Sequence, residues 1–180
     1  SVPTRRFSDL AVRSRFDVPQ YQKLKRETDE LVGRINGQFA TVSWTPIWYF
    51  YRSMPFENLI DLYTSSQIAL ITPVRDGMNL VAKEYVATRV NQDGVIILSE
   101  MAGASNEMDE ALLINPNNFE EIADSLKQAL VMPLDEQKKR MKFIQKRLSR
   151  YSVEKWSEEF MKSLNATKNL DKVIVDKKTD

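Results

Sequence analysis

The sequence of 180 residues contains no cysteine and no histidine. Without cysteine the chain can form neither a disulfide nor a thiolate nucleophile. Without histidine it lacks the commonest general base and metal ligand. Any chemistry that these residues perform must therefore depend on carboxylates, arginine, lysine or backbone dipoles.

A large net charge and long apolar runs are also missing. Lys and Arg number 26 against 25 for Asp and Glu, so the net charge is +1, which argues against nucleic acid or an anionic membrane as a partner. No apolar run approaches the ~20 residues of a membrane span, and the N-terminus shows no signal-peptide pattern. With 42% hydrophobic and 28% charged residues, we expect a soluble, cytoplasmic domain.

Apolar patterning predicts strands that alternate with helices. Continuous apolar runs predict buried strands at 47–51, 67–72, 95–98 and 111–114. Helical periodicity and helix-end signals occur at 18–37, 53–63, 78–89, 119–131, 135–150 and 152–164. Buried strands separated by helices are typical of a parallel sheet covered on both faces, so we predict an α/β, doubly wound fold. We expect a folded domain at 1–164, with no clear period in its first ten residues, and a polar tail or linker at 165–180.

One loop is a candidate site because it follows a predicted strand and opens a predicted helix. Ligands of open α/β sheets bind at the carboxyl ends of strands, and residues 72–80 would lie there. Gly77 permits a tight turn or the close approach of a ligand. The amides of Asn79, Leu80 and Val81 would lie unpaired in the first helical turn, where a phosphate can bind.

Two carboxylates and an arginine accompany this loop as candidates. Asp76 could accept hydroxyl groups, and Glu84, four residues after Leu80, returns to the same helix face and could hold vicinal ribose hydroxyls. Spacing alone favours simpler interpretations, with Asp76 as a helix cap and Glu84 as a solvated surface charge. Arg15 could grip a phosphate through its planar guanidinium or pair with a surface carboxylate. The aromatic cluster at 44–51 is more typical of core than of a stacking site.

Four further motifs are VGRING at 32–37, WTPI at 44–47, TPVRDGMNLVAKEY at 72–85 and LSEMAGA at 98–104. In order and spacing they resemble the C-terminal half of trehalose-6-phosphate synthases. The resemblance covers roughly residues 11–164. It implies the Rossmann-like donor-binding lobe of a retaining, two-lobed (GT-B) glycosyltransferase. The lobe would be incomplete here, because the family's N-terminal lobe and the first strand and helix of the C-terminal lobe have no counterpart.

The resemblance also implies an activity. Members of the family transfer glucose from UDP-glucose to glucose 6-phosphate without a metal or other cofactor, which gives trehalose 6-phosphate and UDP. The complete protein would thus belong to trehalose biosynthesis, while this fragment alone is expected to be inactive. A trehalose-phosphate phosphatase domain could follow the tail. The alternative is a non-catalytic sugar-nucleotide-binding or assembly module, but the intact Asp76, Asn79 and Glu84 favour the enzyme.

Roles follow by position from the same resemblance. Asp76 is the catalytic assignment, because it matches the carboxylate that holds the donor glucose. The other positions implied for the donor are Met54 against the uracil, Gly77, Met78 and Asn79 around the sugar, Leu80, Val81, Ala82 and Lys83 at the diphosphate, and Glu84 at the ribose. Arg15 matches the arginine that binds the acceptor's phosphate, and its Arg-x-Asp-Val continuation favours it over Arg5. The protein would promote the reaction by positioning the two substrates and by stabilising the charge that develops during transfer.

Overall fold

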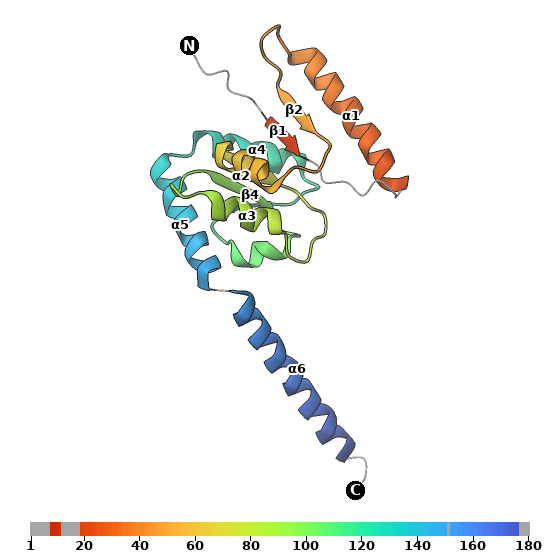
Figure 1. The fold of residues 1–180 in the computed structure, drawn as a ribbon, viewed down its shortest axis with the longest axis vertical. Helices are drawn as coiled ribbons and strands as arrows, with labels where there is room; N and C mark the ends of the chain where they lie inside the picture. Colours follow the sequence, from red (N-terminus) through yellow and green to blue (C-terminus); the bar gives the residue numbers. More distant parts are fainter. Residues whose placement is uncertain (1–7, 12–18, 151, 177–180) are drawn as a thin grey trace. The chain divides into compact units, whose positions relative to one another are not determined.

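The computed structural model describes residues 8–11, 19–150 and 152–176. They divide into two compact units, Ser1–Asn58 and Leu59–Asp180, and Figure 1 shows the elements of both. Each unit has its own parallel sheet, so the described strands form two sheets and not one continuous sheet. No helix in the part of the chain that the structure describes is long and apolar enough to cross a membrane.

The first unit is a small parallel β-α-β arrangement. Strand β1 (Ser8–Ala11) pairs with β2 (Ile47–Phe50), and the connection between them includes helix α1 (Pro19–Phe39). The Asn36 amide fastens the end of α1 to β2, because its Oδ1 accepts the Ile47 amide and its Nδ2 donates to the Ile47 carbonyl, both at 3.0 Å. The sequence predicted α1 and β2 but not β1.

Two predictions about this unit are wrong in detail. Helix α1 does not stop at Gly37 but continues to Phe39, since Gly37 adopts no left-handed conformation. Strand β2 is not buried: Trp48 is 43% exposed, and the other three residues are half-buried. A two-stranded sheet packed against one helix of its unit cannot enclose a dense aromatic cluster.

The second unit confirms the predicted α/β fold with a parallel sheet. Its elements in chain order are α2 (Phe56–Ser65), β3 (Ile68–Ile71), α3 (Leu80–Thr88), β4 (Val95–Ser99), the 3-10 helix η1 (Gly103–Glu107), β5 (Leu112–Ile114), α4 (Phe119–Val131), α5 (Leu134–Arg150) and α6 (Val153–Asp176). The strands lie parallel in the order β3-β4-β5. The continuous apolar runs gave correct positions for all three strands, but only β4 is buried along its whole length. The predicted burial of the other two is wrong in part, because Leu70 of β3 is 41% exposed and Leu113 of β5 is 40% exposed.

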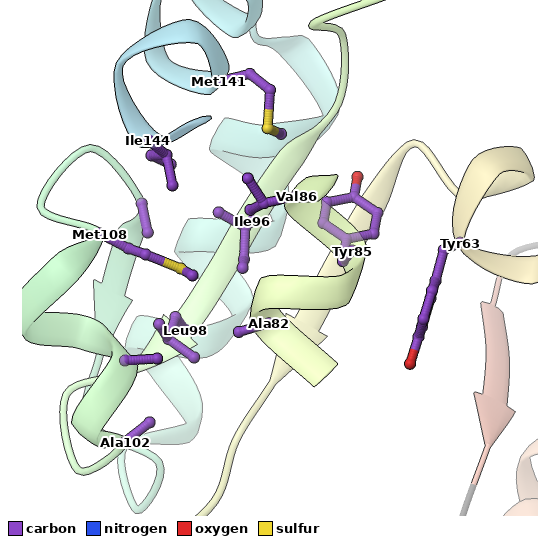
Figure 2. Packing of buried hydrophobic residues seen from close by; sticks show 12 residues of the cluster. Tyr63, Ala82, Tyr85, Val86, Ile96, Leu98, Ala102, Met108, Met141 and Ile144 are labelled. Carbon is purple, nitrogen blue, oxygen red and sulfur yellow. The ribbon is translucent and has the colours of Figure 1, made fainter. Parts of the chain in front are cut away.

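Strand β4 carries the core on both of its faces. All five of its residues are buried, and alternate side chains point to opposite faces of a sheet. Ile96 and Leu98 belong to a cluster with residues of α3, η1 and α5, shown in Figure 2. Val95 and Ile97 belong to a second cluster with residues of α4. The sheet therefore separates two apolar layers, as a doubly wound fold requires.

Helix α6 begins after Ser152, whose hydroxyl accepts the Lys155 amide at 3.4 Å. This agrees with the predicted cap. The helix continues to Asp176, so residues 165–176 of the predicted polar tail are helical.

Candidate functional site

The loop between β3 and α3 is held against the segment that follows β4. The Asp76 amide donates to the Met101 carbonyl at 3.3 Å, and the Gly103 amide donates to the Asp76 carbonyl at 2.8 Å. The Ala104 amide donates to the Met78 carbonyl at 2.6 Å. Asp76 and Ala102 thus form a parallel β-bridge. Two of the motifs found in the sequence, at 72–85 and 98–104, meet here at the carboxyl ends of neighbouring strands.

A relay of side-chain hydrogen bonds fixes the start of helix α3. The Asp76 carboxylate accepts the Met78 amide at Oδ1 and the Asn79 side-chain amide at Oδ2, both at 3.0 Å. Asn79 in turn caps the helix, because its Oδ1 accepts the Ala82 amide at 2.9 Å. Asn79 has φ +81°, a backbone conformation that asparagine tolerates better than most residues. The interpretation of Asp76 as the helix cap is therefore wrong: Asp76 orients the capping residue.

The first turn of α3 presents backbone donors beside open space. The predicted first-turn amide of Asn79 lies one residue before the helix, and the Ala82 amide is taken by the cap. In the described part of the chain, no hydrogen bond engages the amides of Leu80 and Val81, as expected for a first helical turn. A Cβ at Gly77 would meet no atom within 4 Å. A ligand can therefore approach the backbone closely at Gly77.

Glu84 and Lys83 each have a partner. Tyr63 Oη donates to Glu84 Oε2 at 3.0 Å, and Glu84 is only partly exposed, so the interpretation of Glu84 as a solvated surface charge is wrong. Burial first, and then the hydrogen bond and charge of Glu84, raise the pKa of the Tyr63 hydroxyl. The Lys83 ammonium reaches both Glu107 carboxylate oxygens at 2.9 Å. The Lys83 side chain thus forms an ion pair with a residue of η1.

The structure brings together all the candidates between Asp76 and Glu84. They occupy a single loop and the first two turns of α3. Met54 is half-buried in the first unit, and its role at a base stays a prediction. Arg15 lies outside the described residues.

Three residues at this site were missed as functional candidates from the sequence. Tyr63 and Glu107 are 21 and 24 residues from their partners, so no local periodicity reveals them. Gly103 lies in a recognised motif, but its role appears only in three dimensions. A Cβ there would overlap the Gly77 carbonyl oxygen and lie 2.6 Å from the Gly77 carbonyl carbon. No larger residue can therefore occupy position 103 without displacing the Gly77 backbone.

Comparison with known proteins places the chain among the glycosyltransferases. Residues 6–166 match the model of glycosyltransferase family 20. The chain belongs to this family.

Two curated relatives and one solved structure illustrate the similarity. The chain is 44% identical over 172 residues to a UDP-forming alpha,alpha-trehalose-phosphate synthase A of Dictyostelium discoideum, covering 95% of this chain and 24% of that protein. It is 48% identical over 160 residues to a bifunctional trehalose-6-phosphate synthase/phosphatase of Thermoproteus tenax, covering 89% and 22%. A UDP-forming synthase from Burkholderia xenovorans, crystallised with glucose-6-phosphate, superposes with TM-score 0.80 at 39% identity, covering 84% and 34%. The chain therefore spans a quarter or less of these curated relatives.

Proposed function

We propose that the complete protein containing this chain is an alpha,alpha-trehalose-phosphate synthase. It transfers glucose from UDP-glucose to glucose 6-phosphate and releases trehalose 6-phosphate and UDP. The observation that carries this proposal is the loop at Asp76, where a carboxylate, open backbone amides and the open space at Gly77 lie together. The family membership and the acceptor bound in the Burkholderia xenovorans relative support it.

In this proposal the donor lies along the start of helix α3. The diphosphate accepts the Leu80 and Val81 amides at the positive end of the helix dipole. The glucosyl group lies over Gly77, Met78 and Asn79, and the Asp76 carboxylate accepts its hydroxyl groups. Glu84 accepts the ribose hydroxyls one turn further along the helix.

The reaction at this site depends on holding the donor in place and on stabilising the charge of the leaving group. The bond between the glucosyl C1 atom and the diphosphate oxygen breaks, and the amides of the helix start stabilise the negative charge that develops on the leaving UDP. The oxygen of the acceptor hydroxyl forms the new bond to C1 and gives its proton to the leaving phosphate, so no side chain is needed as a nucleophile or as a general base. The residues between Asp76 and Glu84 act by orienting the donor for this transfer.

Further residues complete the proposed contacts to the donor and the acceptor. Met54 contacts the uracil, and the Lys83 backbone and Ala82 adjoin the diphosphate. Arg15 binds the phosphate of the acceptor, together with an N-terminal lobe. A phosphatase domain like the one named for the Thermoproteus tenax relative could be attached as well.

Gly77→Ala is expected to weaken UDP-glucose binding without changing stability. The added methyl group meets no protein atom within 4 Å, so the melting temperature should match the wild type. The same methyl group would overlap a sugar seated on the loop, and such overpacking should raise the Kd about tenfold or more. Titration calorimetry and thermal unfolding measure the two effects. Unchanged affinity would show that no ligand approaches the backbone at this point.

Asp76→Asn is expected to lower turnover more than nucleotide affinity. A charged acceptor for the glucosyl hydroxyls is lost, which should reduce kcat about 10- to 100-fold. UDP contains no glucosyl group, so its Kd should change little. The assay follows UDP and trehalose 6-phosphate formed by the complete protein from UDP-glucose and glucose 6-phosphate. Saturable UDP binding without any transfer by the wild type would instead favour a non-catalytic sugar-nucleotide-binding module.

A further inference from the structure

A buried tyrosine on helix α2 holds the carboxylate of Glu84. The Tyr63 side chain is 9% exposed, and its hydroxyl donates to Glu84 Oε2 at 3.0 Å. Figure 2 shows Tyr63 beside helix α3, with its hydroxyl at the Ala82 end, whereas the Tyr85 hydroxyl points the opposite way. The hydrogen bond therefore comes from a different helix than the one that carries Glu84.

The backbone of Tyr63 is itself fixed. Arg89 is 5% exposed, and its Nη1 donates to the carbonyls of Tyr63, Thr64 and Ser66 at 3.2, 2.7 and 2.9 Å. These carbonyls lie at or just beyond the C-terminal turn of α2, where few backbone amides remain to pair with them, and the Tyr63 carbonyl also accepts the Ser66 amide at 3.3 Å. These hydrogen bonds hold the backbone of the residue whose side chain reaches Glu84.

We propose that Tyr63 is a positioning residue that orients the Glu84 carboxylate and so determines how strongly the site prefers a ribonucleotide to a deoxyribonucleotide. This inference rests on the proposed function, which places the ribose at Glu84. One lone pair of Oε2 is occupied by the tyrosine, and Oε1 with the remaining lone pairs stays available to the vicinal hydroxyls. A glutamate that is already ordered loses less conformational freedom when the ribose binds.

The direction of the hydrogen bond supports this assignment. Burial and the neighbouring carboxylate raise the pKa of the Tyr63 hydroxyl, so this hydroxyl is the donor in its hydrogen bond to Glu84 Oε2. Glu84 then keeps acceptor capacity, and ribose hydroxyls are donors to it. The tyrosine therefore takes one acceptor position of the carboxylate and leaves the others to the ribose hydroxyls.

The test is Tyr63→Phe in the complete protein, with UDP and 2′-deoxy-UDP as ligands. The ring and its packing are kept, and only the hydroxyl is lost. The Kd of UDP should rise about fivefold to tenfold through the lost preorganisation, while the Kd of 2′-deoxy-UDP should change much less, so the preference between the two nucleotides falls. The kcat at saturating substrates should stay close to the wild type. An equal weakening of both nucleotides would overturn the inference, since it would indicate a purely structural role.

Tyr85→Phe is the matched control. Tyr85 is a residue of α3 that is 1% exposed, and its hydroxyl donates to the carbonyls of Ser66 and Gln67 at 3.3 and 3.1 Å. Its loss should lower stability and leave the nucleotide preference unchanged. A loss of preference in this variant equal to that in Tyr63→Phe would overturn the specific role of Tyr63.

Glu84→Gln separates a failure of this inference from a failure of the proposed function. If Glu84→Gln leaves the preference for UDP unchanged, the ribose is not at Glu84 and the proposed donor site fails. If Glu84→Gln removes the preference and Tyr63→Phe does not, the role of Tyr63 alone is overturned. The double variant should be no worse than Glu84→Gln by itself, because the tyrosine acts only through that carboxylate.

Discussion

In the complete protein, replacing Gly103 with alanine is expected to lower the rate of the proposed glucosyl transfer about 100-fold, because a displacement of reacting groups by ~1 Å can cost that much. The new Cβ would overlap the Gly77 carbonyl oxygen, and it would lie 2.6 Å from the Gly77 carbonyl carbon and 3.2 Å from the Met78 amide nitrogen. All three are backbone atoms that cannot rotate away. Relief requires breaking the hydrogen bonds of Gly103 and Ala104 to the loop, and the Asp76 carboxylate would move with it.

Gly33→Ala is the control for this substitution. Gly33 lies inside helix α1, and a Cβ there would meet no atom within 4 Å. This exchange should gain about 0.5–1 kcal/mol of stability from the better helix propensity of alanine and leave activity unchanged. Steady-state kinetics with UDP-glucose and a melting curve for each variant give the comparison. If Gly103→Ala keeps activity within about threefold of the wild type, the close approach of the two segments does not position the loop.

The positions of the three strands of the second unit could be predicted because each carries a continuous apolar run, although only β4 is buried on both faces. Strand β1 (Ser8–Ala11) could not, since its four residues, SDLA, carry no apolar pattern. It is a strand because it pairs in register with β2, and pairing between distant segments leaves little trace in either one. The burial of β2 was overestimated for a related reason: aromatic residues predict a strand but not how many faces of it are covered.

The sequence predicts where a ligand would bind, but it does not predict the contacts inside the loop. A buried strand followed by a polar, glycine-containing loop and a helix indicates a ligand position in an α/β sheet. Asn79, and not Asp76, caps helix α3, and it does so with a positive φ. The spacing of residues in the sequence does not reveal this backbone conformation. The sequence also does not distinguish the two glycines of the loop contact. A methyl group at Gly77 would enter open space, whereas one at Gly103 would overlap backbone atoms of Gly77.

Replacing Arg89 with methionine is expected to destabilise the second unit more than any other single change considered above. The guanidinium donates to three carbonyls at the end of α2, to the Asp93 carbonyl at 3.0 Å, and pairs with the Asp93 carboxylate at 2.7 Å. Methionine fills much of the same volume but donates no hydrogen bond. Removing one partner of a buried ion pair costs about 3–5 kcal/mol, and the lower end applies because the Asp93 side chain is 36% exposed.

The expected result for Arg89→Met is a fall in the free energy of unfolding of about 3 kcal/mol, seen as a urea midpoint lower by about 1 M or more. Lys142→Met is the control, because it removes one positive charge from an exposed position on α5 and should change the midpoint little. Arg89 also fixes the carbonyl of Tyr63, so the variant should lose part of its preference for UDP over 2′-deoxy-UDP even at temperatures where it stays folded. A midpoint equal to that of Lys142→Met would show that solvent replaces these five contacts, and that the end of α2 needs no arginine to hold Tyr63 against Glu84.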